Sequence, residues 1–382
     1  MPFCLRRCHY CSFKSQAVGS LSPSQRDELF TEYLAAVEKE AALWQLPFAP
    51  ATLYLGGGTP SLLQHKLAPF IERLRRRFAL PRTAEITVEA NPGTVNQEIL
   101  ASLATAGVNR LSLGLQSASD ELLKACGRLH SWEDFLQTWR AAREVGFKNI
   151  SLDLIYGLPG QTLASWSQTL SAALALAPEH ISLYALSVEE GCGWATLPEA
   201  AFPAEEEVAE DYQLACEVLE RRNYVHYELS NWSQPGRESR HNLLYWTGGE
   251  YLGLGAAAHS SLGNARVWNC WPVSDYLQRI ACEDRTLTYS WALPAACGKW
   301  AATAGGERLN ADFKRAETLI LALRLMAGVD RREFRAQYGW PAKWDRAVDS
   351  LVGSGLLAKD PLRLTARGFL LANQVFLRFL DD

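Results

Sequence analysis

The segment PFCLRRCHYCSF, residues 2–13, places Cys4, Cys8 and Cys11 within one short loop. Three thiolates in a C-x3-C-x2-C spacing can ligate three irons of a [4Fe–4S] cube and leave the fourth iron without a protein ligand, whereas ferredoxin-type clusters take four cysteines. The alternative is zinc, which needs four tetrahedral ligands. Only His9 is near enough in sequence to be the fourth, at a strained spacing between two cysteines. The spacing therefore favours a cluster with an open coordination site.

The other six cysteines show no ligand spacing, and we expect them to be small buried hydrophobic residues. They are Cys126, Cys192, Cys216, Cys270, Cys282 and Cys297. Nine cysteines in a chain without a signal peptide favour a reducing compartment over a disulfide scaffold. No apolar run is long enough to span a bilayer. The sequence therefore predicts a cytoplasmic protein that is not integral to a membrane.

Length and composition limit the number of domains and the kind of partner. The chain has 382 residues, of which 48% are hydrophobic, so two or three domains with substantial cores are expected. The formal net charge is -4, and no basic stripe is visible. This charge balance argues against nucleic acid as a partner.

Short apolar strands alternate with amphipathic helices between residue 20 and about residue 190, which is typical of βα units that build a parallel sheet. The strands are expected at 51–55, 85–89, 109–114, 150–155 and 180–185, and the helices at 24–45, 64–78, 96–106, 119–126, 131–146 and 162–176. Active sites of such barrels lie at the carboxyl ends of the strands. Unusual residues gather at those ends, namely Gly56–Pro60, Glu89–Gly93, Gln116 and Asp153–Gly160.

The rest of the chain follows a different pattern. A helix at 205–222 and a strand at 224–229 precede a polar, Gly-rich stretch, and residues 290–308 have too little periodicity to be more than a linker or an insertion. Helices are then expected at 314–326, 330–338, 342–354 and 368–379, with a two-stranded turn before the last. This order is that of a winged-helix-like module. Its mixed charge favours a packing or lid domain over DNA binding.

Seven segments, in this order, resemble the radical S-adenosylmethionine (SAM) enzymes. Within them the chain is similar to the oxygen-independent coproporphyrinogen III oxidase group, and most closely to the heme chaperones of that group. The segments are PFCLRRCHYCSF (2–13), YLGGGTPSLL (54–63), ITVEANPGT (86–94), RLSLGLQS (110–117), LDLIYGLPGQT (152–162), HISLYALSVEEG (180–191) and the stretch from HYELSNW to GAAAHS (226–260). Together they extend over nearly the whole chain.

The resemblance implies a fold and a division into domains. The expected fold is a partial (βα)6 barrel of the TIM type with its first strand missing, followed by a small winged-helix-like α domain. Residues 1–200 would form the core that binds the cluster and SAM. Residues 201–290 would complete the barrel and carry a heme-associated region, and residues 311–382 would form the C-terminal domain.

The resemblance also implies a cofactor site, with no residue acting as a catalyst itself. The cysteines would hold the cluster, and SAM would bind the open iron. The glycines that follow the strand at 51–55 would let the backbone approach a ligand closely. The alternative is that this Gly-rich run is only a tight turn between a strand and a helix. Polar groups in apolar strands need partners because burying them unpaired costs roughly 2–7 kcal/mol. The residues implied are Cys4, Cys8 and Cys11 for the cluster, and Tyr10, Gly57, Gly58, Thr59, Glu89, Gln116, Arg128 and Asp153 around it and SAM.

Two of these residues have open alternatives. Arg128 aligns with the arginine that meets the SAM carboxylate in the family, which is a natural use of a guanidinium; the alternative is a solvated arginine at a helix end. Tyr10 would shield the cluster edge, and the alternative is an ordinary packed aromatic.

Two features separate chaperone from oxidase. The oxidases carry a fourth cysteine two residues after the third, where this chain has Phe13, and a longer N-terminal region that seats a second SAM. His241 opens HNLLYW, which matches the HNxxYW signature of the chaperones and would be an axial heme ligand. A hydrogen-bonded structural histidine is the alternative, and His259 is a weaker candidate ligand.

The leading hypothesis is a chaperone that delivers heme to apo-hemoproteins of the respiratory chain and uses an electron donor for its cluster. The runner-up is an oxygen-independent coproporphyrinogen III oxidase of heme (porphyrin) biosynthesis.

The N-terminal segment departs from the family pattern. Relatives have a strand that ends in Tyr-x-His-x-Pro-Phe-Cys, and only Pro-Phe-Cys is present before Cys4. We expect the true start to lie upstream, since an open sheet edge beside the cluster would be costly. A chain that really begins at Met1 is expected to retain its cluster weakly.

Overall fold

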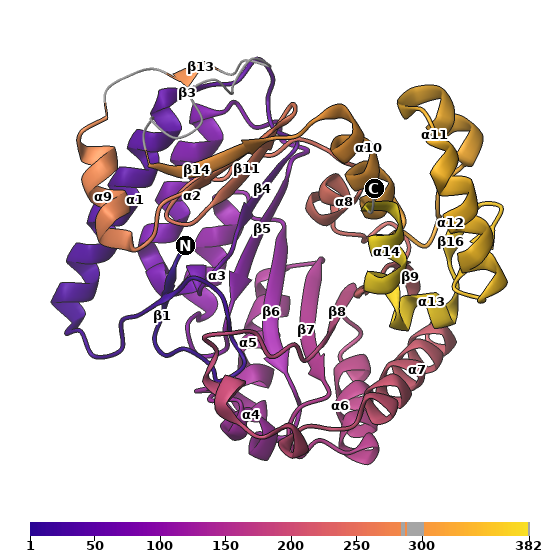
Figure 1. Cartoon of the computed structure of the whole chain (residues 1–382). Coiled ribbons are helices and arrows are strands. Elements are labelled where there is room, and N and C mark those ends of the chain that lie inside the picture. Colours follow the sequence, from indigo (N-terminus) through magenta and orange to yellow (C-terminus); the bar gives the residue numbers. More distant parts are fainter. Residues whose placement is uncertain (284–286, 289–301, 381–382) are drawn as a thin grey trace.

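A curved seven-stranded sheet forms the centre of the molecule in the computed structural model, which describes residues 1–283, 287–288 and 302–380 (Figure 1). Its strand order is β4-β5-β6-β7-β8-β10-β9, with the first five parallel and β10 antiparallel to both neighbours. The bounds are β4 (Thr52–Leu55), β5 (Glu85–Ala90), β6 (Arg110–Gln116), β7 (Ile150–Tyr156), β8 (His180–Ala185), β9 (Val225–Glu228) and β10 (Asn231–Ser233).

The sheet begins at β4, so the prediction of a partial barrel without its first strand is confirmed. The residues that precede β4 form a separate small ribbon. In it β1 (Phe3–Cys4) pairs in parallel with β2 (Gln16–Ala17). Cys4, the first cysteine of the N-terminal loop, therefore lies on a two-stranded ribbon beside the barrel.

Helices cover the outer face of the parallel sheet (Figure 1). They are α1 (Pro23–Leu43), η1 (Pro60–Lys66), α2 (Leu67–Arg77), α3 (Gln97–Thr105), α4 (Asp120–Ala125), α5 (Trp132–Val145) and α6 (Leu163–Ala175). Capping boxes begin three of these helices, at Ser22, Ser131 and Thr162. In each, the capping side chain accepts from the backbone N–H three residues later, and the side chain of that residue accepts from the backbone N–H of the cap. All predicted helices of this half are present, with η1 preceding α2 where a single helix was expected.

The strands are apolar on one face and polar on the other. Along β6, Leu111 and Leu113 are fully buried in the main apolar cluster beneath α3 and α5, whereas Arg110 and Ser112 face a cavity on the opposite side. Burying each leucine side chain contributes roughly 1.5–3 kcal/mol. The period of two along each strand thus separates the core from the site.

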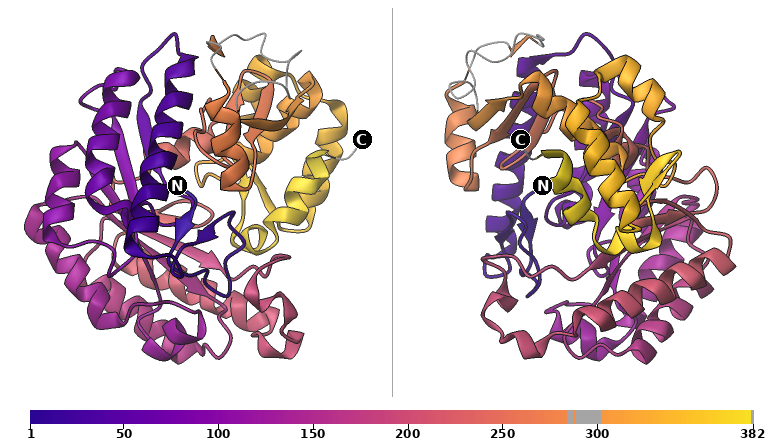
Figure 2. Two further views of the ribbon diagram at one scale, coloured as in Figure 1. Left: turned by 90° about the vertical axis from the view of Figure 1, so that its left-hand side faces the viewer. Right: turned by 45° about the vertical axis from the view of Figure 1, so that its right-hand side comes forward.

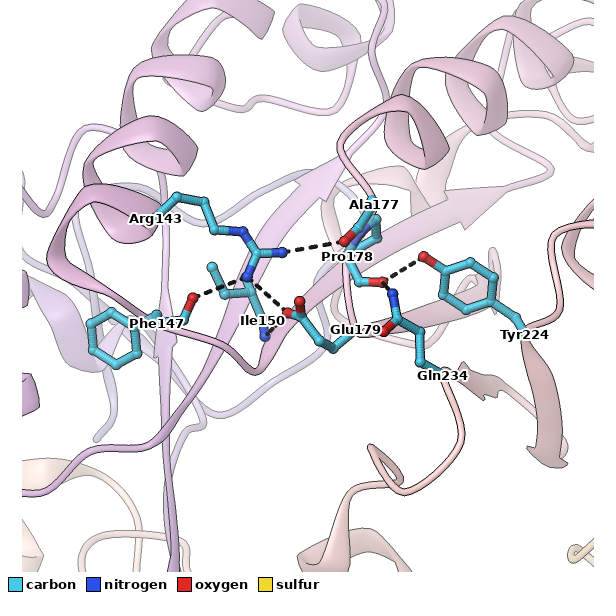
Figure 3. A network of polar contacts seen from close by, with 8 residues as sticks. All are labelled: Arg143, Phe147, Ile150, Ala177, Pro178, Glu179, Tyr224 and Gln234. Carbon is cyan, nitrogen blue, oxygen red and sulfur yellow. Dashed lines mark hydrogen bonds and ion pairs between the residues drawn. The ribbon is translucent and has the colours of Figure 1, made fainter.

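A network of polar contacts ties the amino-terminal ends of the strands, opposite the site (Figure 3). The Glu179 carboxylate accepts from Ile150 N at 2.9 Å and from Arg143 Nη1 at 3.0 Å. Arg143 also donates to two backbone carbonyls of the neighbouring loops. The carbonyl of Pro178 accepts from Tyr224 and Gln234, which joins β8 to the antiparallel end of the sheet. These hydrogen bonds hold the amino-terminal ends of the strands together. In barrels of this type, residues at this face stabilise the fold, whereas the opposite face carries the active site.

A second group of elements follows the barrel. It comprises η2 (Gly193–Thr196), η3 (Glu199–Ala201), α7 (Glu205–Arg221), α8 (Arg240–Trp246), the antiparallel strands β11 (His259–Leu262), β12 (Ala265–Asn269) and β14 (Thr303–Arg308), and α9 (Val273–Ala281). The strand β13 (Leu287–Thr288) pairs in parallel with β3 (Trp44–Gln45), which precedes β4 in the chain. Residues 290–308 were predicted to be a linker or an insertion; residues 303–308 form a strand that pairs with β12, so they are not a linker. Residues 289–301 lie outside the described residues.

The C-terminal residues form a small unit with its own apolar cluster (Figure 2). Its elements are α10 (Ala311–Ala322), α11 (Arg331–Tyr338), α12 (Ala342–Gly353), the antiparallel hairpin of β15 (Leu357–Lys359) and β16 (Leu362–Leu364), α13 (Ala366–Leu370) and α14 (Ala372–Leu380). Three helices followed by a hairpin confirm the winged-helix-like order. The unit joins the barrel through an isolated bridge between Glu228 and Leu325. The division at residues 200 and 290 stays a prediction.

The cysteines outside the N-terminal loop are only partly as expected. Cys126, Cys192 and Cys270 are buried, as predicted for small hydrophobic residues. Cys282, at the C-terminal end of α9, is exposed, so the prediction is wrong for this residue. Cys216 on α7 is half-buried and packs against the main apolar cluster. Cys297 lies outside the described residues. Within the described part of the chain, no helix has the length and apolar character to cross a membrane.

Candidate functional site

A cavity of about 410 Å³ opens at the carboxyl ends of the parallel strands. Every residue that the sequence assigned to the cluster and SAM lines it. These are Cys4, Cys8, Tyr10, Cys11, Gly57, Gly58, Thr59, Glu89, Gln116, Arg128 and Asp153. The fold therefore brings together side chains from segments spread over 150 residues of sequence, which is the arrangement expected of a site in this class of barrel. His241 does not line this cavity.

The cysteine loop is fixed on both sides by backbone contacts. The amide of His9 donates to Cys126 O at 2.9 Å, and the carbonyl of His9 accepts from Trp194 N at 2.9 Å. Arg6 donates to Gly127 O at 2.6 Å. The loop is thus held between the end of α4 and η2, with the three thiols turned toward the cavity. Tyr10 packs in the small apolar cluster that contains Trp194, at 6.2 Å between ring centroids.

The turn after β4 is built for close approach of backbone. Gly57 has a φ of +106°, a conformation that favours glycine. A Cβ on Gly58 would lie 2.6 Å from Phe3 O and 2.8 Å from Phe3 N, so the turn packs directly on β1. The amide of Thr59 donates to Phe3 O at 2.7 Å. The glycines therefore place the turn beside Cys4 as well as beside the cavity.

A chain of hydrogen bonds links two of the cysteines through residues of three loops, which follow β4, β5 and α4. Thr59 Oγ1 lies 3.5 Å from Cys4 Sγ and accepts from Asn91 Nδ2 at 2.8 Å. Asn91 Oδ1 accepts from Arg128 Nη2 at 2.6 Å, and Arg128 Nη1 lies 3.8 Å from Cys8 Sγ. Sequence reasoning missed Asn91 as a site residue. The feature of the sequence that could have identified Asn91 is the Asn-Pro-Gly turn that follows the strand containing Glu89.

Arg128 is held inside the site. Besides Asn91 and Cys8 it donates to Gly114 O at 2.7 Å. A Cβ on Gly114 would meet Asn91 Oδ1 at 2.9 Å and Arg128 Nη2 at 3.1 Å, so only glycine leaves room there. The alternative of a solvated arginine at a helix end does not describe this side chain.

Glu89 is a carboxylate bordered by the glycine turn. It accepts from Tyr54 OH at 2.8 Å and from Gly57 N at 3.2 Å. Burial raises its pKa to about 7, against the opposing effect of the Tyr54 hydrogen bond. A carboxylate that is costly to keep charged is stabilised by a cationic ligand group, such as an ammonium.

Gln116 ends β6 with an unusual backbone. Its φ is +68°, and the pairing of β6 with β7 shifts between Gly114 and Gln116. A non-glycine residue in this region is uncommon and is found at sites where the surroundings hold it. The bulge turns the Gln116 side chain into the cavity.

Asp153 lies deeper, on β7. Ser112 donates to its two oxygens at 2.9 and 3.1 Å, and Ser151 donates at 3.4 Å. Burial raises the pKa of Asp153, and the hydrogen bonds from Ser112 and Ser182 oppose this. The serines satisfy the carboxylate within the barrel.

His241 lies on α8, against β4, with both ring nitrogens engaged. Nδ1 is 2.8 Å from Thr52 Oγ1, and Nε2 is 2.8 Å from Tyr245 OH. The ring stacks on Tyr54 at 4.9 Å. Burial, with the nearby Arg110 charge as second cause, lowers the pKa of His241 to about 4. A neutral imidazole is the form that ligates iron, but ligation would require one of these two hydrogen bonds to be released.

The donor set fits an iron–sulfur cluster with an open iron. Three thiols border the cavity, and Thr59 and Arg128 direct hydrogen-bond donors toward two of them. Such donors are the usual surroundings of cluster sulfurs. Among the described residues, no three His, Cys, Asp or Glu side chains are arranged to hold a single metal ion.

Comparisons with known proteins agree with this geometry. A family model described as Radical SAM superfamily matches residues 1–173. The heme chaperone HemW of Bacillus subtilis (strain 168) is 34% identical over 396 residues, covering 100% of this chain and 98% of the relative. The heme chaperone HemW of Mycobacterium tuberculosis (strain ATCC 25618 / H37Rv) is 35% identical over 381 residues, covering 98% of this chain and 92% of the relative.

A solved structure shares the fold. Coproporphyrinogen III oxidase (HemN) from Escherichia coli, a radical SAM enzyme, matches with a TM-score of 0.82 over 99% of this chain and 88% of its own. At 23% identity this likeness concerns the fold alone. The barrel, the cysteine loop and the cavity thus define a radical SAM protein. Within that superfamily the chain belongs to the HemW family, as its identity to HemW relatives over nearly their full length shows.

Proposed function

We propose that this protein is a heme chaperone that binds a [4Fe–4S] cluster and SAM, binds heme, and transfers the heme to apo-hemoproteins. The observation that carries the proposal is the identity of 34% to a relative named heme chaperone HemW, over 98% of that relative. The HNLLYW segment (241–246), present here on α8, supports it.

The chain's own residues would bind and orient the cofactors. Cys4, Cys8 and Cys11 would hold the cluster, and Glu89 and Gly57 would take the SAM ammonium. Arg128 would meet the SAM carboxylate while its hydrogen bond to Asn91 fixes its position. When bound, a reduced cluster supplies an electron to SAM. An electron donor, the heme and its recipients would be the partners.

Phe13 favours the chaperone over the oxidase. It stands where the oxidases carry a fourth cysteine, and its side chain is 63% exposed and lines the cavity. A phenyl ring cannot replace a thiol in proton or metal chemistry, whereas an exposed aromatic ring suits contact with a flat macrocycle. Oxygen-independent coproporphyrinogen III oxidation remains the second candidate because the fold is shared with HemN.

The test is anaerobic cluster reconstitution followed by heme titration, monitored by the heme absorbance band, with the wild type, His241→Ala and His259→Ala. The proposal expects stoichiometric heme binding that is lost in His241→Ala and kept in His259→Ala, whose ring is exposed beside Trp268. Heme release to an apo-cytochrome b is then followed by the spectrum of the acceptor. Consumption of coproporphyrinogen III with vinyl product, together with no heme retention, would contradict the proposal and favour the oxidase.

A further inference from the structure

Arg110 is a buried cation whose hydrogen-bonding groups are not used. The side chain is 2% exposed, begins β6 on its polar face, and lines the floor of the cavity. Its Nε has no hydrogen-bond partner, and in the described part of the chain no carboxylate forms an ion pair with its guanidinium. An arginine this buried is expected to be paired, since an uncompensated buried charge costs several kcal/mol. The expected partner is therefore a group that the chain does not supply.

The nearest acidic side chain does not provide this partner. Asp153 is bonded by Ser112 and Ser151, and Arg110 acts on it only through its charge. Burial lowers the pKa of His180, and the Arg110 charge is a second cause there as well. The Arg110 charge thus acts on groups of β4, β7, β8 and α8, while no described residue accepts a hydrogen bond from its guanidinium and the residue lines the cavity.

A second donor comes from the HNLLYW segment. Asn242 lines the same cavity, and no described residue makes a hydrogen bond to its side-chain amide. Its position is fixed because the Glu85 carboxylate accepts from Arg240 N at 3.0 Å and from His241 N at 2.9 Å. These bonds attach the first turn of α8 to β5. The segment therefore reaches the cavity through Asn242, while His241 is turned toward Thr52 and Tyr54.

We propose that Arg110 and Asn242 form a subsite for a carboxylate of the bound ligand. A guanidinium offers a planar pair of N–H donors that matches a carboxylate, and a side-chain amide adds a further N–H. This inference rests on the proposed function for its ligand. A propionate side chain of heme and the carboxylate of SAM have the same chemistry, and Arg128 is already placed for the latter beside the cysteines.

The test compares ligands with and without the carboxylate. Binding of heme and of heme dimethyl ester, and of SAM and of decarboxylated SAM, is measured with the reconstituted wild type, Arg110→Met and Asn242→Leu. Arg75→Met is the matched control, because Arg75 is a partly buried arginine bound to Ala106 O outside the cavity. Loss of a charge-assisted pair is expected to weaken the carboxylate-bearing ligand about 10- to 100-fold in Arg110→Met and less in Asn242→Leu.

The outcomes distinguish a heme propionate from the SAM carboxylate, and they distinguish failure of the subsite from failure of the proposed function. A loss confined to heme, with the diester unchanged, assigns the subsite to a propionate; a loss confined to SAM, with its decarboxylated form unchanged, assigns it to the SAM carboxylate. Equal affinities of each pair in the wild type, or equal losses for both members of a pair in Arg110→Met, would overturn the subsite. If Arg110→Met does not fold, Arg110→Gln is titrated with the same two pairs of ligands in its place. A wild type that binds no heme contradicts the proposed function, and the SAM pair still tests Arg110.

Discussion

The side chain of Asn91 joins Arg128 to Thr59: its Oδ1 accepts from Arg128 Nη2 at 2.6 Å and its Nδ2 donates to Thr59 Oγ1 at 2.8 Å. Because Arg128 and Thr59 each approach a different cysteine sulfur, one amide orients two donors. Partners that orient the surroundings of a metal site affect its affinity and its redox potential.

We predict that Asn91→Ala weakens iron retention after reconstitution, by about 10- to 100-fold in affinity, the usual effect of losing such a partner. We also expect a lower reduction potential, since donors near sulfur stabilise the electron-rich reduced cluster. Iron content and a redox titration followed by electron paramagnetic resonance measure both. Asn96→Ala is the control, because Asn96 caps α3 and does not line the cavity. An unchanged potential in Asn91→Ala would show that the amide does not act on the cluster.

We predict that Gly58→Ala abolishes stable cluster binding. The added Cβ would lie under 3 Å from two backbone atoms of Phe3, and backbone cannot move aside without displacing β1 and Cys4. Gly353→Ala is the matched control, since its Cβ meets nothing within 4 Å and Gly353 is the last residue of α12, so the substitution should leave the fold and the iron content unchanged. Iron per chain and thermal unfolding are measured for both. A Gly58→Ala protein with wild-type iron content would mean that β1 tolerates the shift.

The sequence predicted the barrel well because the apolar strands and helix caps are local signals. The residues that the resemblance assigned to the cluster and SAM all line the cavity, because most of them stand at or near the carboxyl ends of strands. Arg110 and Asn91 were missed for different reasons. Arg110 was missed because it is the first residue of its strand, where a charged residue is usually exposed, whereas the structure buries it on the cavity face of β6. The Asn-Pro-Gly sequence identifies Asn91 as a turn residue. Its contacts with Thr59 and Arg128 depend on the tertiary arrangement of three loops that are far apart in sequence.

Glu40 should make stability depend on pH. It lies buried on α1 and accepts from Gly255 N, Tyr276 OH and Asn269 Nδ2, each at 2.7 Å. Burial nevertheless raises its pKa to about 7 from 4.5. The folded state therefore binds this proton more tightly than the unfolded state. The resulting stabilisation is fully present below pH 4.5 and is lost as the pH rises through 7.

The measurement is the free energy of unfolding by urea at pH 5 and pH 8, for the wild type and Glu40→Gln. Other titrating groups cancel in the difference between the two proteins. We expect the wild type to lose roughly 2–3 kcal/mol relative to Glu40→Gln between these two pH values. A difference that stays constant with pH would show that Glu40 does not titrate in this range.

The C-terminal unit should be weakened separately from the cofactor site. Trp344 is almost fully buried in the second apolar cluster, with Trp340 at 5.1 Å and Phe379 at 5.7 Å between ring centroids, both edge-to-face. Trp344→Ala removes these contacts and leaves a cavity, so it should cost about 3–5 kcal/mol. Because none of these rings lines the cofactor cavity, iron content at low temperature should stay at the wild-type level. Hydrogen exchange locates the loss: faster exchange confined to residues 311–380 supports a separate C-terminal domain, as the proposed division of the chain requires. Equal acceleration in β4–β8 would instead mean that the two apolar clusters unfold as one, and that the unit stabilises the barrel it covers.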